Sequence, residues 1–261
     1  MSDIAAGLSG RHALVTGASR GIGAAIAAAM VADGVRVSLV GRDAVRLAEV
    51  AAELGGAERA VPIVADVTDA SSVRAAFATA RQRLGPVQIL VNNAGQAASA
   101  KFTDTDEALW NRLIGVNLTG TYLCTREAIA DMLQAGCGRI VNIASIAGLR
   151  GAAYVSAYVA SKHAVIGLTR ALALEYATRN ITVNAVCPGY TDTDMVRQAI
   201  ANIKTKTGRS ESEVLANLTA GNPQRRLITP TEVSAAVLWL CRPGTESVTG
   251  QSIVIAGGEV T

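Results

Sequence analysis

Short apolar runs rich in β-branched residues alternate along the chain with longer stretches of helical periodicity. The apolar runs cover residues 12–16, 35–40, 60–65, 87–91, 139–144, 182–186 and 252–255, and helical stretches include residues 22–33, 44–54, 73–84 and 158–177. Strands that alternate with helices form right-handed βαβ units in one parallel, doubly wound sheet. The pattern therefore predicts an α/β protein of the Rossmann type.

The composition agrees with a sheet covered by helices. Half of the 261 residues are hydrophobic but only 3% are aromatic, so the core is built mainly from aliphatic side chains. Such a core is typical of buried parallel strands and argues against an all-β sandwich. Because no repeat, low-complexity tract or Pro/Gly-rich linker divides the chain, we expect residues 1–261 to form a single domain.

One segment breaks the alternation of strands and helices. Residues 190–229 carry no strand signal and become polar and helix-prone. An insertion of this length between two sheet elements is more often a substrate-binding lid than a passive connector. We therefore call residues 190–229 the lid segment and expect it to be a helical insertion.

The charge pattern argues against nucleic-acid and membrane partners. The net charge is +3, and lysine and arginine are scattered singly. Met1 to Gly10 lacks the features of a signal peptide, and the longest apolar run, residues 24–32, is too short to cross a bilayer. These features predict a cytoplasmic protein. The four cysteines lie far apart without a C-x-x-C pair, so we expect no metal site or disulfide and mostly buried thiols.

The first predicted strand runs directly into a glycine-rich turn that precedes a helix of small apolar residues. Glycines permit close approach of the backbone to a pyrophosphate, and a helix N-terminus offers free N–H groups. The candidate phosphate-binding residues are Gly17, Ser19, Arg20, Gly21, Ile22 and Gly23. The spacing differs from G-x-G-x-x-G, so an ordinary glycine-rich turn stays open on this motif alone.

The end of the second strand bears on the choice of dinucleotide. An acidic residue there would accept hydrogen bonds from an adenosine ribose and repel a 2′-phosphate. This chain instead has Arg42, and Arg20 adds a second positive charge. Guanidinium groups bind phosphates in a bidentate manner, so NADP(H) is favoured and NAD(H) stays possible. In the alternative interpretation Arg42 is solvated and Asp43 caps the next helix.

Asp66 and Val67 follow the third strand, where a carboxylate can hydrogen-bond the adenine amino group of a dinucleotide. Thr68 or Asp69 could instead cap the following helix.

After the fourth strand, Asn93, Ala94 and Gly95 form a second turn of small residues. We expect Ala94 and Gly95 to line the cofactor and the asparagine side chain to tie this turn to neighbouring strands.

Tyr158 and Lys162 fall at i and i+4 near the start of a helical stretch, so the two side chains share one face. A nearby cation favours phenolate, and we therefore expect the lysine to lower the tyrosine pKa and make the phenol a usable acid or base. This pair alone is a weak signal. Ser145 strengthens it, because this residue ends the fifth strand, and ligands bind outside the carboxyl ends of parallel strands.

With these motifs in order, the chain resembles a short-chain dehydrogenase/reductase over essentially its whole length. The matching elements are Thr16 to Gly23, Asp66-Val67, Asn92 to Gly95, Asn117, Ser145, Tyr158 with Lys162, and Pro188-Gly189.

The resemblance implies roles for each of these residues. Tyr158 would be the general acid/base, and Ser145 would orient and polarise the substrate oxygen. Lys162 would bind the nicotinamide ribose, and Asn117 would hold a water in the proton relay. Pro188, Gly189, Thr191 and Thr193 resemble the family's loop over the nicotinamide carboxamide.

Four other residues are judged separately. His12 opens a strand and His163 follows the lysine on its helix, so both are expected to be structural. Tyr154 and Tyr190 could line a substrate pocket or serve in packing.

The expected reaction interconverts a ketone and a secondary alcohol. Residues 138–145 and 181–189 look similar to bacterial 3-ketoacyl thioester and polyketide ketoreductases, which suggests an acyl-thioester substrate. Basic side chains near the expected pocket rim could meet the phosphates of a carrier; they are Arg150, Lys204, Lys206, Arg209, Arg225 and Arg226. The alternatives are a dehydrogenase of a cyclic or steroid-like alcohol and a non-catalytic NADP(H)-binding sensor.

The resemblance also implies a homotetramer. Long helices, expected here over residues 112–134 and 158–177, form subunit interfaces in the family.

Overall fold

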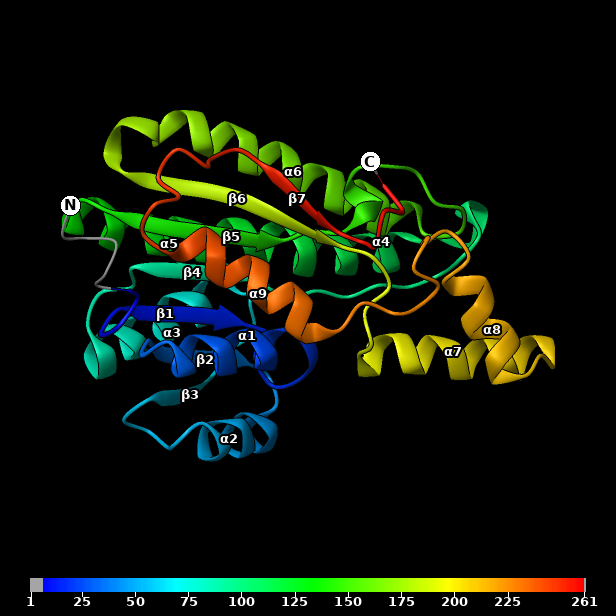
Figure 1. Ribbon diagram of the computed structural model, residues 1–261, viewed down its shortest axis with the longest axis horizontal. Helices are drawn as coiled ribbons and strands as arrows, with labels where there is room; N and C mark the ends of the chain where they lie inside the picture. Colours follow the sequence, from blue (N-terminus) through cyan, green and yellow to red (C-terminus); the bar gives the residue numbers. More distant parts are fainter. Residues whose placement is uncertain (1–6, 261) are drawn as a thin grey trace.

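A seven-stranded parallel sheet in the order β3-β2-β1-β4-β5-β6-β7 forms the centre of the computed structural model (Figure 1). Its strands are β1 (His12–Thr16), β2 (Arg36–Gly41), β3 (Ala60–Val64), β4 (Ile89–Asn92), β5 (Gly138–Ile143), β6 (Ile181–Pro188) and β7 (Ser252–Ile255). The strand order reverses between β1 and β4, as in a doubly wound sheet. The predicted Rossmann-type fold is confirmed, with strand bounds within two residues of those expected.

The structure describes residues 7–260. Residues 1–6 and 261 of the expected domain, and with them most of the N-terminal segment judged for a signal peptide, lie outside the described residues.

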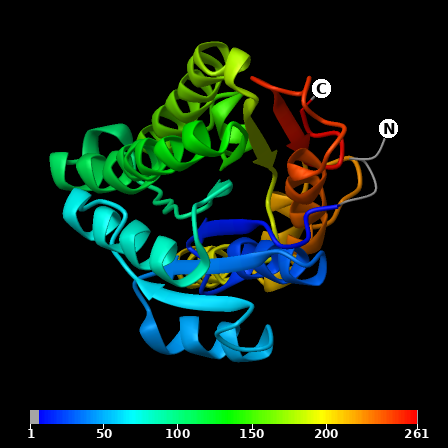
Figure 2. The same ribbon diagram turned by 90° about the vertical axis from the view of Figure 1, so that its left-hand side faces the viewer.

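Helices cover both faces of the sheet. They are α1 (Gly21–Ala32), α2 (Ala44–Glu53), α3 (Ala70–Leu84), α4 (Glu107–Ile114), α5 (Gly120–Ala135), α6 (Ser156–Glu175), α7 (Asp194–Thr207), α8 (Glu211–Leu218) and α9 (Pro230–Cys241). Figure 2 shows the sheet between a layer containing α3, α5 and α6 and a layer containing α1 and α9. Within residues 7–260 no helix is both long and apolar enough to span a membrane.

The strand residues alternate between the two layers. Ala13 and Val15 of β1 belong to the core beneath α1 and α9, whereas Leu14 faces α3 and α5 on the other side. Burial on both faces explains why the strands read as continuous apolar runs. The expectation of mostly buried cysteines is also confirmed, since Cys124, Cys187 and Cys241 are buried.

Two acidic residues start helices, as one of the alternative interpretations held. The Asp43 carboxylate accepts a hydrogen bond from Arg46 N at 3.1 Å at the start of α2. The Asp69 carboxylate accepts one from Ser71 N at 2.9 Å at the start of α3. Both are N-caps, which satisfy backbone donors that a helix leaves free.

The single helix expected over residues 112–134 is wrong in one respect. A π-helical turn, Gly115–Thr119, separates α4 from α5, and Asn117 lies within it. The backbone carbonyl of Asn117 accepts a hydrogen bond from the Thr121 hydroxyl at 2.8 Å. The apolar pattern over residues 112–134 does not distinguish one π-helical turn from a continuous α-helix, because such a turn spans only a few residues.

The lid segment is helical, as predicted, and contains α7 and α8, which project beyond the carboxyl ends of the strands in Figure 1. Its two ends pair with each other. Thr191 and Ile228 form a parallel bridge, Asp192 N donates to Ile228 O, and Ile228 N donates to Tyr190 O, both at 2.8 Å. The lid segment therefore begins and ends at the same place beside the sheet.

Candidate active site

The glycine-rich turn after β1 packs closely against the turn after β4. Gly17 has a φ of 65°, and a Cβ there would lie 2.9 Å from the Cα of Ala94. The Asn93 side chain donates to Thr16 O at 2.9 Å and to Gly17 O at 3.1 Å. The asparagine thus ties the two turns together, as expected, and glycine is required at 17 by both space and conformation.

The N-terminus of α1 begins after Arg20, whose backbone is extended. Among residues 7–260 no side chain caps the N–H groups of the first turn of α1. Those N–H groups remain available to an anion, and glycines at 21 and 23 keep side chains away from them. Of the other residues predicted in this turn, Ser19 is half-buried and Ile22 packs against the core beneath α1.

The lid segment reaches this turn. The Thr193 Cγ2 atom lies 3.2 Å from where a Cβ of Gly21 would be. The Arg20 guanidinium lies 3.9 Å from the Asp194 carboxylate at the start of α7. The arginine predicted to add positive charge to the phosphate site therefore also faces a carboxylate of the lid segment.

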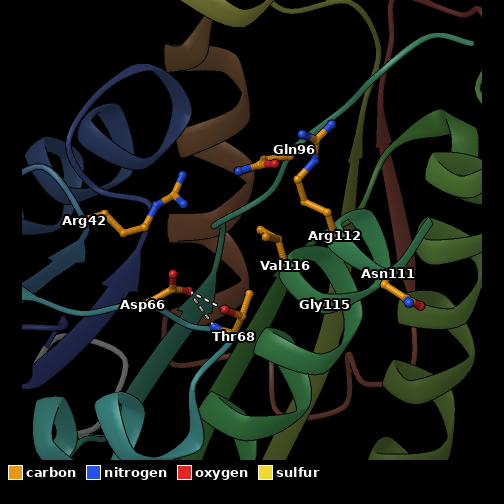
Figure 3. Close-up of a pocket in the computed structure, with 8 residues that line it drawn as sticks. All are labelled: Arg42, Asp66, Thr68, Gln96, Asn111, Arg112, Gly115 and Val116. Atoms are coloured by element: carbon orange, nitrogen blue, oxygen red, sulfur yellow. Dashed lines mark hydrogen bonds between the residues drawn. The ribbon is translucent and has the colours of Figure 1, made fainter. Parts of the chain in front are cut away.

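A pocket of about 240 Å³ opens beside the ends of β2 and β3 (Figure 3). Its lining residues are Arg42, Asp66, Thr68, Gln96, Asn111, Arg112, Gly115 and Val116. One oxygen of Asp66 accepts hydrogen bonds from the backbone and hydroxyl of Thr68, at 2.9 and 2.7 Å. These bonds, with a smaller effect of the Arg42 guanidinium, lower the pKa of the Asp66 carboxyl.

Arg112 was missed as a site residue by the sequence interpretation. It lies on α4 and faces the same pocket as Arg42, so two guanidinium groups and one carboxylate line it. The local signal that could have identified it was its position, five residues before Asn117. Val67, in contrast, packs its side chain near Gly120, where a Cβ would lie 2.8 Å from Val67 Cγ2.

Ser145, Tyr158 and Lys162 meet at the carboxyl end of β5. The Lys162 side chain is buried, and its Nζ donates to Ile143 O at 2.8 Å. The same Nζ lies 5.7 Å from the centroid of the Tyr158 ring. Ser145 is buried directly after β5, and its Oγ accepts a hydrogen bond from Ala147 N at 3.1 Å. The predicted convergence of the three residues is present.

Asn117 joins this cluster through its side chain. Its Oδ1 accepts from Gln96 N at 2.8 Å, and its Nδ2 donates to Gln96 O at 2.9 Å and to Ser161 Oγ at 3.0 Å. Ser161 Oγ in turn donates to the backbone carbonyl of Tyr158 at 2.7 Å. Ser161, which the sequence interpretation missed, therefore links Asn117 to the first turn of α6. A Cβ at Gly95 would lie 3.1 Å from Asn117 Oδ1 and 3.6 Å from Lys162 Nζ.

The tyrosine pKa moves opposite to the expected direction. Burial raises the pKa of the half-buried Tyr158, and its interaction with the Ser145 hydroxyl only partly opposes this rise. Burial also lowers the pKa of the Lys162 ammonium to about 8. Without a dinucleotide the phenol is therefore held in its protonated form at neutral pH, because desolvation outweighs the hydrogen bond with Ser145.

The loop after β6 carries the other predicted nicotinamide contacts. Gly189 N donates to Ile255 O at 3.0 Å, which continues the pairing of β6 and β7 beyond Pro188. The Thr191 hydroxyl donates to Gly189 O at 3.1 Å, and the Thr193 hydroxyl to Thr191 O at 3.3 Å. The hydroxyls of Thr191 and Thr193 thus stabilise the conformation of the loop by hydrogen bonds to its own backbone.

The two histidines take no part in the cluster. His12 is buried, with Nδ1 2.7 Å from Gly85 O and Nε2 2.9 Å from Ser38 Oγ. His163 is exposed, and its Nδ1 lies 2.9 Å from Val159 O. The position of His12 agrees with the structural role expected for it, and a structural role for His163 stays a prediction.

Three of the six basic side chains proposed to meet a carrier's phosphates form ion pairs with carboxylates of this chain. Lys204 pairs with Glu211 at 2.8 Å, Arg226 with Glu232 at 2.6 Å, and Arg150 with Glu259.

Comparison with known proteins agrees with this geometry. Residues 11–204 match the family model described as short chain dehydrogenase. The chain is 42% identical to a protein assigned as ketoacyl reductase 1 of the granaticin polyketide synthase of Streptomyces violaceoruber, over 94% of this chain and 92% of the relative. It is 38% identical to a 3beta-hydroxysteroid dehydrogenase of Mediterraneibacter gnavus, over 95% and 94% of the two chains.

A solved structure is similar throughout. The actinorhodin polyketide ketoreductase, solved with NADPH, superposes with a TM-score of 0.91 at 38% identity and covers 95% of this chain and 97% of its own. The chain therefore belongs to the short-chain dehydrogenase family of NAD(P)-dependent oxidoreductases that act on CH–OH groups.

Proposed function

We propose that this protein reduces the ketone of a 3-ketoacyl thioester to a secondary alcohol with NADP(H), or runs the reverse oxidation. The observation that carries the proposal is the convergence of Ser145, Tyr158 and Lys162 at the end of β5, beside the glycine-rich turn and the pocket of Arg42. Two hydroxyls and one buried ammonium form a proton-transfer site for an oxygen atom.

Bound NADPH would supply the hydride that the carbonyl carbon accepts. The Ser145 hydroxyl binds and polarises the carbonyl oxygen, and the Tyr158 phenol donates its proton to that oxygen as negative charge develops. Burial supports this role, because the raised pKa keeps the phenol protonated at neutral pH. Lys162 stays fixed on Ile143 O, where its charge offsets the phenolate that forms.

The residues present fit a dinucleotide. The uncapped start of α1 suits a pyrophosphate, and the pocket in Figure 3 suits an adenosine with a 2′-phosphate, since Arg42 and Arg112 both line it. Asp66 retains one carboxylate oxygen that is not bonded to Thr68 and could accept from the adenine amino group. NADP(H) is therefore the proposed cofactor. The contacts of Gly189, Thr191 and Thr193 with the carboxamide remain predictions.

The acyl-thioester substrate is supported by the granaticin and actinorhodin relatives, whose names denote ketoacyl and polyketide reduction. The test is a spectrophotometric panel with NADPH and NADH, each offered 3-ketoacyl-CoA thioesters of several lengths and 3-ketosteroids. Turnover of the thioesters with NADPH is the expected result. Turnover of steroids alone would favour the cyclic-alcohol alternative, and cofactor binding without turnover of any ketone or alcohol would favour the sensor.

A homotetramer is proposed for the assembly. Large apolar side chains stand exposed on the helices expected at the interfaces, namely Tyr122 on α5 and Leu174 on α6, with exposed fractions of 46% and 83%. Light scattering on the purified protein tests this. The cytoplasmic location likewise remains a prediction.

A further inference from the structure

The Glu259 carboxylate lies buried between two parts of the chain. One is the loop that joins Ser145 to Tyr158, here called the catalytic loop, and the other is the base of the lid segment, by which we mean Gly189, Tyr190 and Gly221. The Glu259 side chain is only 5% exposed and forms an ion pair with Arg150, whose side chain is 46% exposed. Arg150 belongs to the loop between Ser145 and Tyr158, so this pair joins the end of the chain to the catalytic loop. A carboxylate is rarely buried to this degree without a specific partner.

The same carboxylate also lies close to Gly189, which directly precedes the lid segment, and to Gly221, within it after α8. A Cβ at Gly221, beyond α8, would lie 2.8 Å from Glu259 Oε1, and a Cβ at Gly189 would lie 3.4 Å from Oε2. A side chain at position 221 would therefore displace the carboxylate from its present position. Figure 1 shows the red C-terminal segment beside the orange segment that returns from α8.

Tyr190 lies within the electrostatic reach of this pair. The Glu259 carboxylate raises the pKa of the Tyr190 phenol and the Arg150 guanidinium lowers it, while burial raises it most. Tyr190 begins the lid segment, and its phenol also acts on the pKa of Tyr158. The ion pair therefore lies close to Tyr190, which in turn lies close enough to Tyr158 to act on its pKa.

We propose that Glu259 and Arg150 form a latch that holds the base of the lid segment against the catalytic loop and thereby sets the binding geometry of the ketone. Glu259 is a positioning residue in this scheme, since it acts through Arg150 and the lid segment. The proposal rests on the proposed ketoreductase function for its kinetic readout. It has a second readout, the mobility of α7 and α8, that does not depend on activity.

The substitution Glu259→Gln keeps the shape of the side chain and removes its charge. We expect it to raise the KM for the ketone about tenfold, with kcat changed less than threefold and the KM for NADPH nearly unchanged. Tryptic cleavage at Lys204, Lys206 and Arg209 in the exposed part of the lid segment should accelerate several-fold. Glu259→Asp, which retains the charge, should recover part of both effects.

Glu246→Gln is the matched control. Glu246 pairs with the buried Arg139 at 3.0 Å, at the amino ends of β5 and β6, far from the catalytic cluster. Its loss should alter stability without changing the KM for the ketone or the cleavage of the lid segment. If Glu259→Gln fails to fold, the double variant Arg150→Gln with Glu259→Gln, which leaves no buried charge unpaired, takes its place.

Three results would overturn the latch: an unchanged KM for the ketone, an unchanged rate of tryptic cleavage, or equal effects in the Glu246→Gln control. If the wild-type protein reduces no ketone at all, the proposed function fails. The cleavage comparison then still decides whether the latch exists.

Discussion

The Lys162 ammonium donates a hydrogen bond of 2.8 Å to the backbone carbonyl of Ile143, the last residue of β5. This hydrogen bond fixes the Lys162 side chain, which comes from α6, at the edge of the sheet and keeps its positive charge buried. Because the charge is desolvated, the pKa of Lys162 falls to about 8. The buried Lys162 ammonium therefore destabilises the folded state, but it lies where the proposed chemistry uses its charge.

Lys162→Met is expected to stabilise the fold and destroy activity. At pH 7 the lysine is protonated in both states, and its burial costs the folded state about 1–3 kcal/mol, which methionine recovers. Urea unfolding at pH 7 measures this gain. Wild-type stability should also rise as the pH increases from about 8 to 10.5, because the unfolded state then binds more protons. Lys206→Met, which changes an exposed lysine of α7, should leave stability at pH 7 unchanged and retain the rise with pH. A Lys162→Met protein no more stable than wild type would contradict the argument.

Tyr158→Phe should lower the rate of ketone reduction by at least about 100-fold, because the proton donor is lost. Cofactor affinity, measured by NADPH fluorescence, should change less than about twofold. Tyr176→Phe, at the other end of α6, serves as the control and should retain full activity. A Tyr158→Phe enzyme with normal turnover would show that another group donates the proton.

Removing either guanidinium from the pocket should weaken NADPH binding specifically. Arg42→Gln and Arg112→Gln are each expected to raise the Kd for NADPH about 10- to 100-fold and to leave the Kd for NADH unchanged, because only NADPH carries the 2′-phosphate. Isothermal titration with both cofactors measures this. Arg46→Gln, on α2 beside Glu49 and outside the pocket lining, is the control. Equal losses for NADPH and NADH would show that the arginines do not bind that phosphate.

His12 should make stability fall as the pH falls below about 6.5. Burial lowers its pKa from the ordinary value of 6.5, and the hydrogen bond between the ring and the Gly85 carbonyl opposes this shift only in part. Below that value the unfolded chain binds a proton that the folded chain does not, and the loss is at most about 1.4 kcal/mol per pH unit. Urea unfolding between pH 8 and 5.5 tests this. His12→Gln should flatten the dependence, whereas His163→Gln should retain it.

The fold and the centre of the site follow from local sequence signals. Alternating apolar runs predict the sheet because a parallel strand is buried on both faces, and the strand bounds hold to within two residues. The spacing from Tyr158 to Lys162 fixes one helix face, and the position of Ser145 after a strand fixes the sheet edge. These relationships span a few residues, so the chain determines them by itself.

Contacts between distant segments were decided only by the tertiary structure. Apolar periodicity does not place Arg112 beside Arg42, interrupt the helix at Asn117 or pair Arg150 with Glu259. The pKa of Tyr158 rises for the same reason, because desolvation depends on every element packed around the phenol and here outweighs the hydrogen bond with Ser145. The sequence therefore determines which groups can do the chemistry, and the packing of the whole domain decides their charge state and their partners.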